Sequence, residues 1–228
     1  MIQRIVTSNP SPAYIARISA VFNNDGHMVK GNLKAVIRAL LLDPEARIRQ
    51  PSSGAGKLRE PILRLTAWAR ACAVTSASDT WAIGNTSDPT THLGQSPLRS
   101  ASVFNFFRPG YVPPGSAIAN AGLVAPEFQI TNESTVVGYV NFMQRLVGFG
   151  IGDVLPNYTP WLPLADNGAS LMAEVNIVVA AGQLGPSTVT LIASVINGMP
   201  TGTVPLRLNR IRVALVLVLA APEFIVLK

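Results

Sequence analysis

Apolar residues recur every three to four positions through most of this sequence, which is the spacing of one face of an α-helix. This pattern predicts helices at residues 12–22, 32–41, 61–72, 132–147, 170–183, 186–197 and 205–221. The β-branched runs at 177–179 and 216–218 leave a strand open as an alternative there, although the length of each pattern favours helix. The expected fold class is therefore mainly α, an irregular helical bundle.

Residues 74–131 interrupt the helical pattern with closely spaced glycines, prolines and other turn-forming residues. The stretch also carries many aromatic residues, which favour packing over disorder. We expect a long aromatic- and Pro/Gly-rich segment packed over the helices, with one short helix at residues 100–107. The chain is then a single helical domain of residues 1–228, with helices in 1–73 and 132–228 on either side of this segment.

The composition excludes several classes of protein. With 48% hydrophobic and 13% charged residues, the chain lacks the signature of disorder. Its glycines follow no three-residue period, so a collagen-like helix is excluded. The single Cys72 excludes an internal disulfide and a cysteine-based zinc site, and its alanine neighbours favour a buried, inert thiol.

Charge is distributed unevenly along the 228 residues, whose net charge is +6. Residues 1–70 hold eleven basic and four acidic side chains, and residues 207–228 hold four basic and one acidic. Basic ends can attract anions, so an anion-binding module is one alternative function. The basic residues are widely spaced and no nucleic-acid recognition motif accompanies them, which argues against nucleic acid as a partner.

The chain is expected to have no transmembrane segment and no signal peptide. Its longest apolar run, residues 213–222, is too short to span a bilayer. Polar and charged residues among the first four leave no apolar leader there.

No motif identifies a reaction, a metal or a cofactor. Asp88, His92 and Ser96 are close in sequence, but the second glycine of a nucleophile elbow is missing, so they are interpreted as polar loop residues. The acids are scattered, and no phosphate-binding or zinc pattern occurs. We therefore predict no cofactor and no metal site, and leave the catalytic residues unknown.

The aromatic stretch in the middle of the chain is the best candidate for a binding surface. Its members are Phe104, Phe106, Phe107, Arg108 and Tyr111. If exposed, these rings would form a patch large enough to hold a sugar polymer or a protein partner. The alternative is that they anchor the long segment onto the helices.

Short Pro-Glu motifs follow apolar segments at residues 43–45, 125–128 and 221–224. Proline ends one element, and the carboxylate after it favours the start of the next. We interpret these motifs as boundaries between elements.

Five stretches together resemble the bacterial DUF1800 family, whose function is unknown. They are residues 2–12, 43–47, 57–66, 98–111 and 221–224, of which 98–111 is the most specific. The chain is similar to the C-terminal part of this family, whose members are roughly twice as long and usually look exported. The resemblance thus implies a periplasmic or extracellular parent protein, a separate N-terminal half, and a secreted protein as possible partner. Self-association into a homo-oligomer is also expected if apolar faces are left uncovered.

Two functions from different classes follow. The first is a non-catalytic binding or assembly module of an exported bacterial protein, based on the aromatic segment and the poverty of acid–base chemistry. The second is a hydrolase with a carboxylate site completed by an absent N-terminal half, with Glu60, Glu127 or Glu133 as conceivable participants.

Overall fold

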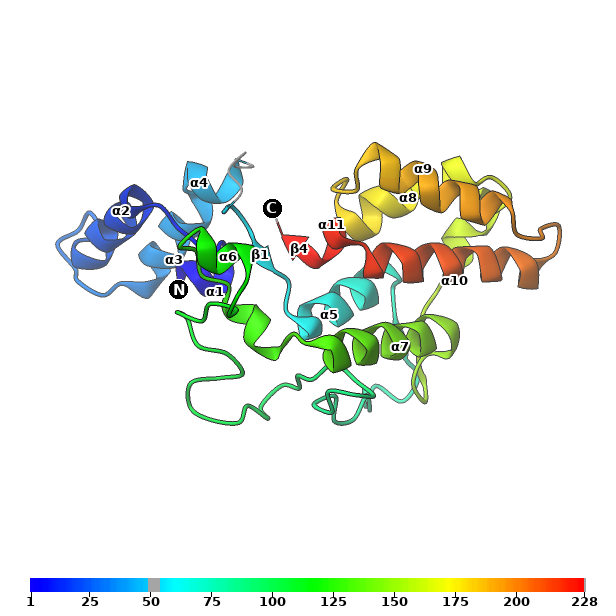
Figure 1. Ribbon diagram of the computed structural model, residues 1–228, viewed down its shortest axis with the longest axis horizontal. Helices are drawn as coiled ribbons and strands as arrows, with labels where there is room; N and C mark the ends of the chain where they lie inside the picture. Colours follow the sequence, from blue (N-terminus) through cyan, green and yellow to red (C-terminus); the bar gives the residue numbers. More distant parts are fainter. Residues whose placement is uncertain (49–53, 228) are drawn as a thin grey trace. The chain divides into compact units, whose positions relative to one another are not determined.

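The computed structural model describes residues 1–48 and 54–227, and the chain is mainly helical (Figure 1). It divides into two compact units. Unit 1 comprises residues 1–58, 107–129 and 226–228, and unit 2 comprises residues 59–106 and 130–225. The mainly α fold class is confirmed, whereas the single domain stays a prediction.

Unit 1 is built around two helices, α2 (Pro12–Asn23) and α3 (Leu33–Leu42), which pack side by side (Figure 1). Ser11 caps α2 by accepting a hydrogen bond from the Tyr14 amide, and proline occupies the first position of the helix. Asn32 caps α3 in the same way. Their small shared core consists of Ile2, Tyr14, Ile18, Val36 and Leu40.

The remaining elements of unit 1 are short. They are α1 (Ile2–Ile5), α4 (Pro44–Arg47), α6 (Ala117–Asn120), most of the 3₁₀ helix η1 (Pro126–Ile130), β1 (Lys57–Leu58) and β4 (Val226–Leu227). β1 and β4 pair antiparallel, with Lys57 opposite Leu227 and Leu58 opposite Val226. This ladder joins segments that are far apart in sequence within one unit.

Unit 2 is a helical bundle with a much larger core. Its long helices are α5 (Pro61–Ala71), α7 (Glu133–Phe149), α8 (Gly168–Ala180), α9 (Pro186–Asn197) and α10 (Val204–Ala220). α10 packs against α7, α8 and α9, and α8 packs against α9 (Figure 1). Short elements complete the unit: β2 (Thr75–Ser76) paired with β3 (Val154–Leu155), the 3₁₀ helix η2 (Thr159–Leu164), and α11 (Pro222–Ile225).

Residues 177–179 and 216–218 lie within α8 and α10, so helix rather than strand is confirmed there. The helix expected at residues 100–107 is wrong, because this stretch forms turns and bends. Leu98 and Asn105 have φ angles of 60° and 72°, a left-handed conformation that cannot continue a right-handed helix.

Part of the long irregular segment crosses helix α7 at very close range. A Cβ atom on Gly138 would lie 2.6 Å from the carbonyl oxygen of Pro89 and 2.9 Å from that of Thr90. Leu93, a few residues further on, is fully buried in the core of unit 2. Residues 89–93 are thus packed onto a helix that lacks a side chain at the contact.

Candidate functional site

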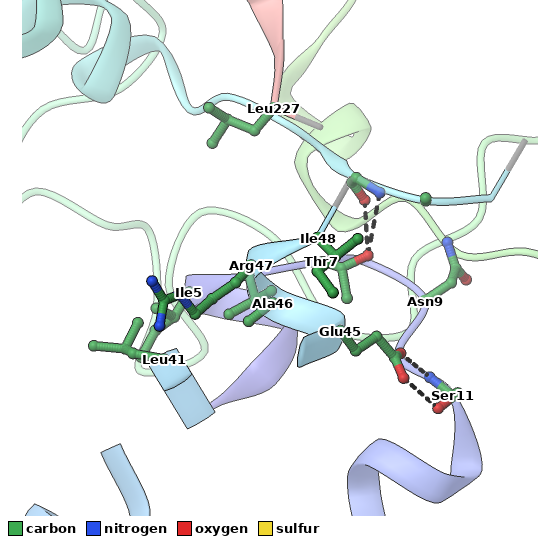
Figure 2. Close-up of a pocket in the computed structure, with 13 residues that line it drawn as sticks. Ile5, Thr7, Asn9, Ser11, Leu41, Glu45, Ala46, Arg47, Ile48 and Leu227 are labelled. Atoms are coloured by element: carbon green, nitrogen blue, oxygen red, sulfur yellow. Dashed lines mark hydrogen bonds between the residues drawn. The ribbon is translucent and has the colours of Figure 1, made fainter. Parts of the chain in front are cut away.

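Unit 1 contains a cavity of about 550 Å³ with a mixed polar and apolar lining (Figure 2). Its polar side chains are mostly engaged in holding the walls together. Thr7 Oγ1 donates to the carbonyl of Gly56 at 3.2 Å, and Asn9 exchanges hydrogen bonds of 3.0 and 2.9 Å with the backbone of Val124. Arg47 is exposed on the lining and has no polar partner among the described residues.

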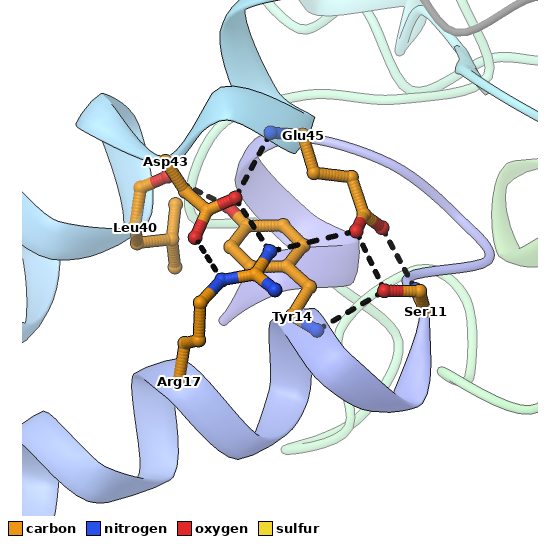
Figure 3. Close-up of polar contacts among 6 residues, drawn as sticks. All are labelled: Ser11, Tyr14, Arg17, Leu40, Asp43 and Glu45. Carbon is orange, nitrogen blue, oxygen red and sulfur yellow. Dashed lines mark hydrogen bonds and ion pairs between the residues drawn. The ribbon is translucent and has the colours of Figure 1, made fainter.

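A polar cluster beside this cavity ties α2 to α4 (Figure 3). Both oxygens of Glu45 accept hydrogen bonds from Ser11, at 2.8 Å from the amide and 2.6 Å from the hydroxyl. Arg17 binds both oxygens of Asp43, at 2.7 and 2.8 Å. Tyr14 completes the cluster by donating its hydroxyl to the carbonyl of Leu40 at 2.6 Å.

Two pKa shifts follow from this cluster. The hydrogen bonds from Arg17 lower the pKa of Asp43 below its usual value. Burial, together with the charges of Asp43 and Glu45, raises the pKa of Tyr14. Asp43 is held ionised and Tyr14 neutral, so the cluster acts as a structural brace of unit 1.

A second structural contact of unit 1 is the ion pair between Lys57 and Glu127, at 3.0 Å. Both side chains are only 1% exposed. Lys57 Nζ also donates to the carbonyls of Gln3 and Arg4, at 3.3 and 2.7 Å. The pair therefore links α1, β1 and η1 inside the unit.

Unit 2 contains a separate cavity, also of about 550 Å³, which we call the tryptophan pocket. Its floor consists of buried apolar residues of the core: Leu65, Trp68, Val74, Leu146 and Val154. Ile62, Ala69 and Ile83 add half-buried apolar walls. The cavity thus lies directly above the hydrophobic core of unit 2.

Trp81 and Arg70 are exposed members of the tryptophan pocket. Trp81 is 46% exposed, and its indole N–H donates to Asp79 at 2.9 Å while its backbone N–H donates to Ser76 at 3.2 Å. Trp81 has a φ of 51°, in the left-handed region, which costs free energy for a residue other than glycine. The two hydrogen bonds offset part of this cost. The side chain of Arg70 has no hydrogen-bond or ion-pair partner among the described residues.

The aromatic residues predicted as a binding surface fall in both units. In unit 2, Phe104 is 69% exposed and Phe106 is half-buried. In unit 1, Phe107 is buried, with the guanidinium of Arg4 4.2 Å from its ring centroid. Arg108 is exposed and Tyr111 half-buried, also in unit 1. Their role as a binding surface stays a prediction.

The three acids considered for hydrolysis have different surroundings. Glu60 is buried in unit 2 and accepts a 2.6 Å hydrogen bond from Gln95, and both residues line a cavity of about 480 Å³ with Phe106. Glu127 belongs to the ion pair of unit 1, and Glu133 is exposed in the first turn of α7.

Asp88, His92 and Ser96 do not form a hydrogen-bonded triad among the described contacts. One oxygen of Asp88 accepts four bonds from Thr90 and Thr91, which lower its pKa, and His92 Nδ1 contacts the hydroxyl of Thr91 at 2.8 Å. Ser96 is buried. These contacts fit the interpretation as polar loop residues.

Cys72 is buried in the core of unit 2, and burial raises its pKa to about 12. Its thiol is therefore protonated at neutral pH. Within residues 1–48 and 54–227, no three histidine, cysteine or acidic side chains gather where they could hold a metal ion. None of the described helices combines the length and hydrophobicity that crossing a membrane requires.

The tryptophan pocket was not identified from the sequence. In the sequence, Trp81 is one of several aromatic residues of the irregular segment and Arg70 is one of several basic residues, so neither indicates a pocket. Trp68, Trp81 and Pro97 line one pocket but come from three separate stretches, so no local sequence motif predicts that they lie together.

Comparison with known proteins gives a family. A family model described as "Protein of unknown function (DUF1800)" matches residues 1–226. No curated protein and no solved structure matches the chain. The matched range covers nearly all 228 residues, so this chain belongs to the DUF1800 family.

Proposed function

We propose that this chain is a non-catalytic binding module of an exported bacterial protein, and that the tryptophan pocket is its ligand site. The observation that carries the proposal is a pocket of about 550 Å³ with an apolar floor, an exposed indole and a guanidinium that no described residue pairs with. Small-molecule sites usually have volumes of roughly 300–1,000 Å³, mainly apolar walls and a few polar groups that fix orientation.

The walls favour a ligand with a flat apolar body. Trp81 uses its indole N–H and its backbone N–H for bonds within unit 2, so its ring faces remain for stacking. These bonds also hold the ring in place before a ligand arrives, which reduces the entropy cost of binding.

Arg70 favours a ligand that also carries a negative charge. Its side chain is exposed, and no carboxylate of the described chain pairs with it. A carboxylate, sulfonate or phosphate on the ligand would supply the missing partner. The proposed ligand class is therefore a small aromatic or alicyclic anion.

Fluorescence titration with anilinonaphthalene sulfonate tests the proposal, since this probe has an apolar ring system and one anionic group. We expect saturable binding at one site. Ala69→Phe should abolish it by filling the pocket, whereas Leu63→Phe, on the same helix and outside the pocket lining, should leave it unchanged. Trp81→Ala should weaken binding, and Arg70→Gln should weaken it by about three- to fivefold.

Equal binding by wild type and Ala69→Phe would overturn this site assignment. Equal binding by wild type and Trp81→Ala, whose ring is exposed, would contradict it independently of any effect on folding.

The proposed binding module is also expected to bind a secreted partner protein or to self-associate. Sedimentation velocity at several protein concentrations tests it, and a monomer at every concentration would argue against self-association.

A further inference from the structure

Unit 1 carries the whole net charge of the protein. Its ranges contain ten basic and four acidic residues, whereas those of unit 2 contain eight of each. The four acids of unit 1 all have partners inside the unit: Asp25 with Asn32, Asp43 with Arg17, Glu45 with Ser11, and Glu127 with Lys57. Asp43 and Glu127 are in ion pairs, whereas Asp25 is held by a neutral side chain and keeps its charge, so the excess of ten basic over four acidic residues remains.

The basic side chains of unit 1 are less engaged. Lys30, Lys34, Arg38, Arg47 and Arg108 are exposed and form no ion pair or side-chain hydrogen bond with any described residue. Lys34 and Arg38 lie four residues apart on α3, hence on one face of it. Lys30 lies in the loop that leads into this helix.

An exposed apolar stripe runs beside these cations on α3. It consists of Leu33, Ile37 and Leu41, which are 56%, 40% and 47% exposed and follow one another at four-residue spacing. The loop before the helix adds Met28, which is 91% exposed, and Val29, which is 50% exposed. Val36 and Leu40, on the adjoining face of the helix, already fill the core.

The stripe continues to the cavity of unit 1. Leu41 lines that cavity together with Ile5 and Arg47, and Figure 2 shows these three side chains at one side of it. Arg47 thus adds a cation at the far end of the stripe. Exposed apolar and cationic side chains thus occur together in the stretch from Met28 to Arg47.

We propose that α3 and the loop before it form a peripheral contact with membranes that contain anionic phospholipids. An amphipathic helix lies in the bilayer interface when its apolar side chains enter the acyl boundary and its cations meet the headgroups. Nucleic acid would pair with the cations but would leave Leu33, Ile37 and Met28 in water. A bilayer surface satisfies both groups, so it fits this face better.

Vesicle cosedimentation tests the proposal. The full chain should bind vesicles of phosphatidylcholine mixed with phosphatidylglycerol, bind phosphatidylcholine alone much more weakly, and dissociate as salt is added. Lys34→Glu or Arg38→Glu should each weaken binding to mixed vesicles by about tenfold. Ile37→Ser, at an exposed position, should weaken it by about fivefold through the lost apolar contact.

Arg99→Glu provides a control with the same change in charge, at an exposed position of unit 2 whose side chain has no polar partner in the described part of the chain. It should change vesicle binding by less than about twofold. An effect as large as that of Arg38→Glu would overturn the proposal, as would equal binding to neutral vesicles. Binding of a short DNA duplex that Lys34→Glu abolishes, without vesicle binding, would replace the membrane with nucleic acid.

Discussion

Lys57 and Glu127, seventy positions apart, form an ion pair at 3.0 Å in which each side chain is 1% exposed. A buried charge that loses its partner is far more costly than a buried pair replaced by apolar residues. Glu127→Ala should therefore lower the free energy of unfolding by about 3 kcal/mol, measured by urea denaturation.

The double variant Lys57→Met with Glu127→Leu is the control. It removes both charges and should recover most of the stability lost in Glu127→Ala. If the double variant is no more stable than Glu127→Ala, burial of an unpaired lysine is not the cause of the loss.

Gly138 and Gly148 lie on the same helix, α7, and should respond to alanine with opposite signs. A Cβ at Gly138 would lie 2.6 Å from a backbone carbonyl, whereas a Cβ at Gly148 meets nothing within 4 Å. Gly138→Ala should destabilise by about 1–3 kcal/mol through overpacking. Gly148→Ala should stabilise by up to about 1 kcal/mol, because alanine favours helix. Thermal melts measure both, and equal shifts would contradict the close contact with residues 89–90.

Asp43 should make unit 1 sensitive to acid. Its folded pKa lies below the ordinary value of 3.8, because Arg17 donates to its ionised form. Folding thus favours the deprotonated group, and its contribution is complete above about pH 4 and lost as the pH falls through the folded pKa.

Asp43→Asn removes this contribution, so wild type should be more stable than the variant at about pH 6. The difference should be smaller at about pH 3, because the contribution decreases as the pH falls towards the folded pKa. Urea midpoints at both pH values measure the difference. Glu174→Gln, which removes a carboxylate of unit 2, is the control, and a similar convergence there would argue against a specific role of Asp43.

Cys72 should be unreactive in the folded protein. Its pKa of about 12 leaves on the order of a thousandth of the thiolate that an ordinary cysteine has at neutral pH. Ellman's reagent should therefore modify Cys72 slowly in buffer and rapidly in denaturant. Rapid stoichiometric modification of the native chain would show that the thiol is accessible.

The sequence predicted most of the helices because their signals are local. The apolar stripes, the caps at Ser11 and Asn32, and the prolines at the start of helices lie within a few residues of one another. The Pro-Glu motifs at 43–45, 125–128 and 221–224 each begin a short helix, α4, η1 and α11, which confirms that part of their interpretation. Those at 43–45 and 221–224 also directly follow the ends of α3 and α10, whereas no element ends at 125.

The wrong helix at residues 100–107 shows where local signals fail. Apolar residues occur there at helical spacing, but Asn105 adopts a left-handed φ and its amide closes a turn to Ser102. The division into two units could not be predicted from local sequence patterns either, because unit 1 combines three separate stretches of the chain. Contacts such as Lys57–Glu127 depend on that long-range arrangement.

The central claim, a ligand site at the tryptophan pocket, is tested most directly by the indole N–H signals in a nitrogen–proton NMR spectrum. The chain has three tryptophans: Trp68 and Trp81 line the pocket, while Trp161 is buried outside its lining. Titration with anilinonaphthalene sulfonate should shift the Trp68 and Trp81 signals saturably and leave Trp161 unchanged. Saturable binding that leaves Trp68 and Trp81 unshifted, or shifts all three signals equally, would contradict the claim.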